Sequence, residues 1–198
     1  MIYEIAHIIK DRFTFLWDMV EWANASLFGI LYGKKLAGLD AVLASISTDF
    51  HFRTAKESDV KNLVNFFARQ SERAFEFFKP HEFDEKAVRK VIKNKAFMTF
   101  IVSSGNHIVG YFFLRSFVNG KSFRGKIVDK DWQGRGIAKL MGIAMTKVSQ
   151  HLRLRMFGSI SPENFASMAS AKASNNIKVL KTLENGYYYI EFLPKPND

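Results

Sequence analysis

Two glycines stand at the start of an amphipathic helix pattern, directly after an apolar strand pattern. The stretch reads Val128-Asp129-Lys130-Asp131-Trp132-Gln133-Gly134-Arg135-Gly136-Ile137-Ala138. The first amide groups of a helix lack partners inside the helix, and the helix dipole is positive at this end. Glycines let a bulky anion approach the backbone, and Arg135 adds a positive charge. The pattern therefore predicts a phosphate-binding helix start.

This stretch matches neither of the common nucleotide-binding motifs. It lacks the spacing and the Lys-Ser/Thr pair of a P-loop, and Lys139 stands where G-x-G-x-x-G has its third glycine. An ordinary tight turn is the alternative interpretation of two glycines alone.

Periodic apolar residues predict the elements that position this loop. From residue 50 the order of patterns is β-α-α-β-β-β-α-β-α-β-β. Predicted strands cover 50–53, 97–102, 108–115, 122–128, 155–160, 177–183 and 187–192, and predicted helices cover 60–67, 88–92, 136–152 and 164–173. This order predicts an α/β (α+β) fold, a mixed sheet with helices on both faces.

Residues 1–48 form a separate N-terminal helical segment in the predicted organisation, ahead of a domain over 49–198. Apolar residues at spacings of three and four define one face of its helix: Ile5, Ile9, Phe13, Leu16, Val20, Ala23 and Leu27. Gly29 and Gly33 predict its end, and 34–45 a second short helix. We expect its broad apolar face to be buried, either against the domain itself or against a second copy of the chain in a homodimer. A membrane is not expected, because the polar face carries acidic residues.

Composition and charge narrow the classes of function. The chain has 198 residues, a formal net charge of +10 and no cysteine, which excludes disulfides and a cysteinyl acyl-enzyme. Basic residues gather after residue 48, which favours a polyanionic partner, a nucleic acid or a phosphate-rich small molecule; a solvated basic face without a specific ligand is the alternative. No nucleic-acid recognition motif accompanies the charge, so we expect no nucleic-acid partner. The first residues lack a secretory signal, which predicts a cytoplasmic protein.

Residues 133–138 resemble the Q/R-x-x-G-x-G/A signature of the GCN5-related N-acetyltransferases (GNAT), in its usual place between the fourth strand and the following helix. The resemblance extends in element order from Phe50 to Pro194. It implies the acyl-CoA N-acyltransferase fold, with a mixed, mostly antiparallel central sheet flanked by helices. It also implies acetyl-coenzyme A (acetyl-CoA) as co-substrate and no metal.

The resemblance implies a cofactor site made largely of main-chain groups. The pyrophosphate would be held by Gln133, Gly134, Arg135, Gly136, Ile137 and Ala138. Ile127 and Val128 would pair with the pantetheine arm, and the Val128 amide would polarise the thioester carbonyl. Asn164 matches the family asparagine that hydrogen-bonds the cofactor, and a simple helix cap is its alternative role.

The family reaction is direct attack of a neutral amine on the thioester, which needs a base and an acid. The tyrosine that many members use as the acid is replaced by Ala171. His81 is our candidate base, because it lies in a loop that flanks the acceptor site in this family; a solvated histidine is the alternative. Arg124 is our candidate for binding an anionic acceptor, such as the phosphates of a nucleotide-linked amino sugar.

Aromatic residues are expected on the acceptor side. We expect Phe77, Phe78 and Phe83 to line the acceptor pocket, with a structural core role as the alternative. Tyr187, Tyr188 and Tyr189 alternate across the last strand, so at least one should face the acceptor.

These features together predict an N-acetyltransferase that moves acetyl from acetyl-CoA to a primary amine of a small molecule, such as an amino sugar or sugar nucleotide. Two alternatives remain open. The first is an N-acetyltransferase for proteins or peptides, and the second is a non-catalytic module that binds acyl-CoA.

Overall fold

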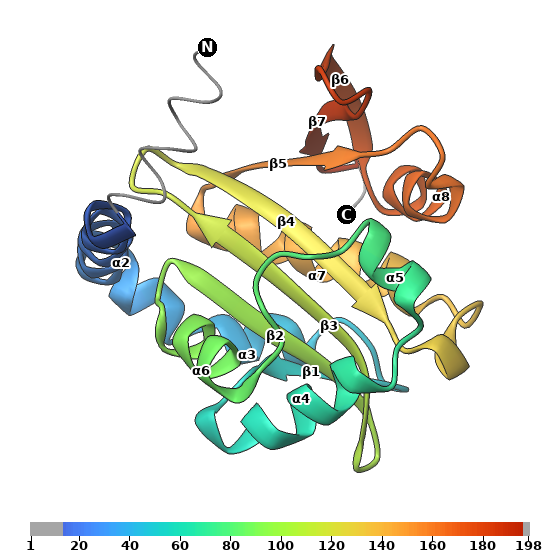
Figure 1. The fold of residues 1–198 in the computed structure, drawn as a ribbon, viewed down its shortest axis with the longest axis horizontal. Coiled ribbons are helices and arrows are strands. Elements are labelled where there is room, and N and C mark those ends of the chain that lie inside the picture. The colour runs from blue at the N-terminus through green and yellow to red at the C-terminus, as the bar shows by residue number, and fades with distance from the viewer. Residues whose placement is uncertain (1–13, 196–198) are drawn as a thin grey trace.

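A seven-stranded mixed sheet organises the protein, and helices cover both of its faces (Figure 1). The computed structural model describes residues 14–195. The strand order is β1-β2-β3-β4-β5-β7-β6, and every neighbouring pair is antiparallel except β4 with β5. The predicted fold class, mixed and mostly antiparallel, is confirmed.

The strands are β1 (His51–Thr54), β2 (Phe97–Ser104), β3 (His107–Ser116), β4 (Lys121–Val128), β5 (Arg155–Ile160), β6 (Asn176–Thr182) and β7 (Tyr188–Leu193). The helices are α2 (Thr14–Leu36), α3 (Leu39–Ala44), α4 (Val60–Ala68), α5 (Glu72–Glu76), α6 (Glu85–Lys93), α7 (Ile137–Leu152) and α8 (Phe165–Ser174), with short 3-10 turns η1 (Glu57–Asp59) and η2 (Lys130–Trp132). The predicted order of elements is confirmed, and the five-residue α5 is an addition to it. No helix among residues 14–195 is both long and apolar enough to cross a membrane.

The parallel strands β4 and β5 separate soon after they meet. Their pairing covers only Lys121 with Arg155, Ser122 with Met156 and Phe123 with Phe157. In the described structure, the rest of β4 has no strand partner on this side. The sheet therefore splits, and the gap is where a ligand can lie.

Two hydrophobic clusters lie on opposite faces of the sheet. One joins α7 with β2, β3 and β5, and includes Phe28, Leu39 and Leu43 from α2 and α3. The other lies under α4 and α6, around Phe67 and Tyr111. Residues before and after position 48 thus share one hydrophobic core. The division into an N-terminal segment (1–48) and a domain (49–198) stays a prediction.

The N-terminal helix differs from its prediction in two ways. It continues through Gly29 and Gly33 to Leu36, so the predicted end is wrong. At Gly29 a Cβ atom would lie 2.6 Å from the Lys95 side chain, which would have to shift. The face that packs on the domain is centred on Phe28, whereas Leu16, Val20 and Leu27 of the predicted apolar face are exposed. Ile5, Ile9 and Phe13 lie outside the described residues.

Candidate active site

A cleft of about 900 Å³ occupies the gap between β4 and β5. Residues 124–128 of β4 and 158–160 of β5 form its sides, and residues 132–134 and 136–139 form one end. Small side chains of α8 form another wall: Ala166, Ala169, Ser170 and Ala173. Phe77 and Phe78, directly after α5, close the cleft from the other face of the sheet. Side chains from both faces therefore meet in one cavity.

The loop after β4 presents unpaired amide groups to this cleft. Gly134 and Gly136 both have φ of 77°, a left-handed conformation that glycine adopts without strain. Gly136 is the N-cap of α7, and nothing lies within 4 Å of where a Cβ atom would stand at either glycine. Within the described chain, no acceptor is found for the amides of residues 133–138. These amides, at a helix start, form a ready anion site.

A buried carboxylate fixes the entrance of this loop. Asp129 is 2% exposed and accepts hydrogen bonds from the Asp131 amide at 3.0 Å and from Arg69 Nε at 2.7 Å. Gln70 donates to Asp129 at 3.3 Å and accepts from the Lys130 amide at 3.0 Å. Burial alone raises the pKa of Asp129, but the Asp131 amide, Arg69 and Gln70 outweigh it and hold this pKa below its usual value. The network ties α4 to the loop.

We expect Asp129→Asn to lower the free energy of unfolding at pH 7 by about 1.5 kcal/mol, since hydrogen bonds to a charged group are lost. A carboxylate with a lowered folded-state pKa stabilises the fold above its unfolded pKa of 3.8. That contribution disappears as the pH falls through the folded-state pKa. Urea unfolding of both proteins at neutral and at strongly acidic pH tests this. Asp131→Asn, an exposed neighbour, is the control and should match wild type, whereas an Asp129→Asn deficit that persists in acid would contradict the assignment.

Two partly buried cations without an acidic partner in the described structure line the cleft. Arg124 and Lys126 lie two residues apart on β4, so their side chains share one face of the sheet. Arg124 donates to Asn175 Oδ1 at 2.8 Å, and its guanidinium lies 3.4 Å from the centre of the Phe192 ring. Lys126 Nζ donates to the Ala138 carbonyl, in the first turn of α7, at 2.6 Å. Among residues 14–195 neither cation forms an ion pair.

The environment of these cations disfavours two positive charges. Burial lowers the pKa of Arg124, although an arginine keeps its proton in proteins. Burial, and then the charge of Arg124, lower the pKa of Lys126 well below its usual value. Of the described residues that line the cleft, only Glu163 is acidic. An anionic ligand would therefore offset the repulsion between Arg124 and Lys126, which no acidic side chain of the described cleft lining neutralises.

The sequence-predicted cofactor residues come together around this cleft. Its lining includes Ile127, Val128, Gln133, Gly134, Gly136, Ile137, Ala138 and Asn164. Arg135 is exposed beside them, with its guanidinium 4.4 Å from the centre of the Trp132 ring. Asn164 caps α8 by accepting from the Ser167 amide at 2.9 Å, and it also borders the cleft. Their roles in binding stay predictions.

His81 lies in the aromatic cluster on the other face of the sheet. Its Nδ1 is 2.6 Å from the Glu82 carbonyl, and its Nε2 is 3.0 Å from the hydroxyl of the fully buried Tyr111. Phe67, Phe83 and Phe97 surround the ring. Burial lowers the pKa of His81, so the ring is neutral at neutral pH. In the part of the chain that the structure describes, His81 and Phe83 do not line the cleft.

The three consecutive tyrosines are likewise not among the described residues that line the cleft. Tyr189 stacks on Phe157 with 5.7 Å between the ring centres, and Tyr188 packs against the core around α7. Ala171, at the position of the family tyrosine, is fully buried. The described structure therefore brings no tyrosine hydroxyl into the cleft.

Sequence reasoning missed Lys126 and the Arg69–Gln70 pair. The signal for Lys126 was its place two residues after Arg124 on one strand, which puts both cations on one face. Nothing in the sequence links Arg69 to Asp129, 60 residues away. Within the described residues, no group of three His, Asp or Glu side chains is placed to hold a metal ion.

No protein-family model matches the sequence, and no curated protein sequence matches it either. Solved structures do match. The GNAT domain of S. lividans PAT is 16% identical, covers 71% of this chain and 88% of its own, and has a TM-score of 0.61. The ribosomal-protein-S5-alanine acetyltransferase from Vibrio fischeri is 16% identical, covers 76% and 96%, and has a TM-score of 0.62.

A third similar structure was solved with ligands. AAC(6')-Ib, in complex with paromomycin and acetyl-CoA, is 12% identical, covers 74% of this chain and 94% of its own, and has a TM-score of 0.59. The fold that the Q-x-x-G-x-A loop implied is confirmed by these matches. This chain has the fold of the GCN5-related N-acetyltransferases, with an N-terminal helix packed against it.

Proposed function

We propose that the protein transfers an acetyl group from acetyl-CoA to a primary amine of a small molecule, such as an amino sugar or sugar nucleotide. The observation that carries this proposal is the cleft between β4 and β5, which ends at the unpaired amides of residues 133–138. A diphosphate fits such a nest, and a long neutral arm fits a narrow gap between strands. The same fold in AAC(6')-Ib holds acetyl-CoA.

The chain supplies the groups that would hold acetyl-CoA. The amides of residues 133–138 bind the pyrophosphate, and Arg135 adds a charge beside them. The main-chain groups of Val128 lie on the edge of β4 that β5 leaves free, so they can pair with the amides of the pantetheine arm, whereas those of Ile127 face β3. Asn164 adds a polar side chain at the start of α8. Beyond Phe165 at its start, the side chains of α8 that line the cleft are small and leave room for the arm.

Acetyl-CoA supplies an activated thioester. In the reaction, a bond forms between the amine nitrogen and the carbonyl carbon, the carbon–sulfur bond breaks, and the thiolate leaves with that electron pair. The amine loses its proton to a base or to water. Because no tyrosine hydroxyl lies in the described cleft, we assign the proton for the thiolate to the ammonium of Lys126. A lysine whose pKa is lowered by burial is a stronger acid than an ordinary lysine.

Arg124 is assigned to an anionic group of the acceptor. Its guanidinium is held by Asn175 and Phe192, and it keeps the remaining donors for a ligand. A phosphate or carboxylate on the acceptor would complete the charge balance of the cleft. An acceptor that carries both an amine and a phosphate, such as a sugar nucleotide, meets this requirement.

The catalytic role of His81 stays a prediction that a single variant can test. Because both ring nitrogens are hydrogen-bonded and the ring is packed among aromatics, we expect His81→Gln to lower the melting temperature while kcat stays within about threefold of wild type. Steady-state kinetics and thermal unfolding measure the two effects. A hundredfold loss of kcat with unchanged stability would instead make His81 the base.

Two alternatives differ in what the protein does with acetyl-CoA. The similar structure from Vibrio fischeri is named for a ribosomal-protein alanine, so a protein acceptor is the first. A module that binds acyl-CoA without catalysis is the second. Incubation with acetyl-CoA and a panel of amino sugars, sugar nucleotides and peptides, followed by mass detection, separates all three. We expect acetylated sugar products; acetylated peptides, or binding without any product, would favour the alternatives.

A further inference from the structure

The outer face of α2 is a continuous apolar surface. Large apolar side chains of this helix are 42–78% exposed: Leu16, Trp17, Met19, Val20, Trp22, Leu27, Ile30 and Leu31. Together they account for most of the exposed large apolar side chains among the described residues. Contiguous patches of this kind mark interaction surfaces in soluble domains.

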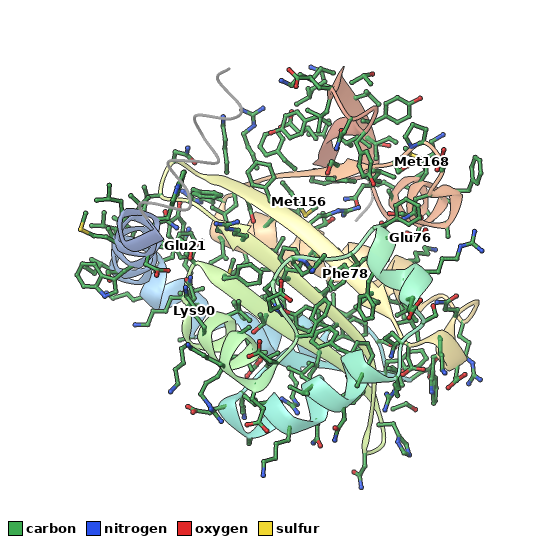
Figure 2. All side chains as sticks on the ribbon, viewed as in Figure 1. Glu21, Glu76, Phe78, Lys90, Met156 and Met168 are labelled. Carbon is green, nitrogen blue, oxygen red and sulfur yellow. The ribbon has the colours of Figure 1, made fainter. Side chains whose placement is uncertain are left out.

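The inner face of α2 is already occupied by its own domain. Phe28 is buried in the core, and Asn24 donates to the Ser116 carbonyl at 2.9 Å. Glu21 accepts from Arg115 at 2.6 Å, and Glu21 also approaches Lys90 of α6, toward which it points in Figure 2. Asp18 pairs with Lys90 at 2.8 Å. These contacts fix the rotation of the helix, so the apolar face cannot turn inward.

The spacing of the outer face matches a helix-pairing seam. Leu16, Val20, Ala23, Leu27, Ile30 and Lys34 follow one another at alternating steps of four and three. A seam of this period lets two helices pack side chains into each other along their length. A surface that binds a small ligand does not require this regular spacing, whereas a surface that packs along a second helix does.

We infer that two copies of this chain pair through α2 in an antiparallel arrangement about a two-fold axis. In this register Val20 lies opposite Ile30 of the partner, and Ala23 lies opposite Leu27. In the two layers nearest the axis the small Ala23 then faces the large Leu27, an alternation that favours close packing. A parallel pair would instead place Ala23 against Ala23, leaving a gap, and Lys34 against Lys34, with like charges in contact.

The exposed area is sufficient for a stable pair. If each fully exposed large side chain offers roughly 150–250 Å², the range for aromatic ones, the exposed fractions on α2 amount to about 700–1,200 Å² per protomer. A standard interface buries about 800 Å² from each partner. An anionic membrane surface is a poorer occupant, since interfacial helices carry basic residues along their length, whereas the basic residues of α2 stand only in its last turn, Lys34 and Lys35.

The pairing surface is remote from the cleft. Asn24 contacts Ser116 and the Val118 amide, at the hairpin that precedes β4. The loop over 133–138 follows the opposite end of β4. In Figure 1, α2 and the gap between β4 and β5 accordingly lie on different sides of the molecule. Loss of pairing should therefore leave acetyl-CoA binding intact.

Val20→Asp tests the inference, because it places a charge in the middle of the seam. Val179→Asp is the matched control, since Val20 and Val179 are 56% and 50% exposed. In analytical ultracentrifugation we expect wild type and Val179→Asp to sediment as dimers of the 22.7 kDa chain, and Val20→Asp as a folded monomer. A monomeric wild type, or a Val20→Asp protein that remains dimeric, would overturn the inference.

Cross-linking tests the antiparallel register separately. The natural chain has no cysteine, so every disulfide that forms must involve the introduced cysteines. A mixture of Val20→Cys and Ile30→Cys chains should form mixed disulfides on mild oxidation, while Val20→Cys alone should not cross-link. Efficient cross-linking of Val20→Cys with itself would point to a parallel pair and contradict the register.

Discussion

Gly136→Val is expected to abolish the rise in melting temperature that acetyl-CoA produces. Gly136 has φ of 77° and open space where a Cβ atom would stand, next to the unpaired amides. A β-branched side chain would occupy the space above these amides and would also disfavour the left-handed backbone. The stabilisation that comes from ligand binding would then be lost. Thermal unfolding with and without acetyl-CoA measures it.

Gly120→Val controls for backbone strain. Gly120 has φ of 78° and equally open surroundings, but it lies in the turn between β3 and β4. Both variants should therefore lose about 1–2 kcal/mol of stability from the left-handed conformation. Only Gly120→Val should keep the shift with acetyl-CoA. A folded Gly136→Val protein with a normal shift would show that the cofactor assignment is wrong.

Lys126→Met is expected to lower kcat by at least a hundredfold while the KM for acetyl-CoA changes by less than about threefold. General acids contribute about 10²–10⁴-fold to rate, and methionine keeps the length of the side chain without its proton. Wild-type kcat should fall at alkaline pH, because Lys126 loses its proton. This alkaline decrease of kcat should be absent in the variant. Because a buried charge is removed, the melting temperature should not fall.

Lys121→Met provides the control on the same strand. Lys121 is exposed at the start of β4, so its removal changes the net charge by the same amount without touching the cleft. We expect its kcat and pH profile to match those of wild type. An unchanged kcat in Lys126→Met would contradict the role of Lys126 and move the acid to water or to another group.

Periodic patterns were sufficient to predict most of the sheet and the long helices. The strands around the Asn119-Gly120 turn and the helix after Gly136 are confirmed, because apolar period and turn residues agree at those positions. The conformation of the glycine loop was also predictable, since the glycines mark left-handed backbone directly in the sequence. Local patterns were therefore sufficient for the fold class and for the shape of this loop.

Features that depend on tertiary packing were not predictable in this way. Gly29 was interpreted as a helix end, but α2 continues through it to Leu36 while packed against the domain. The choice of Phe28 as the inward residue of α2 depends on the core that receives it. Asp129 meets Arg69 across 60 residues, and Lys126 gains its altered pKa from burial that no local pattern records. Such contacts appear only once the chain is folded.

Hydrogen exchange of the amides of residues 133–138, with and without acetyl-CoA, tests the central claim most directly. These amides have no acceptor in the described chain, so they should exchange rapidly in the free protein. We predict that acetyl-CoA protects them strongly, while the amides in the Gly120 turn, at the opposite end of β4, do not change. Protection confined to other parts of the protein, with residues 133–138 still exchanging rapidly, would contradict the account.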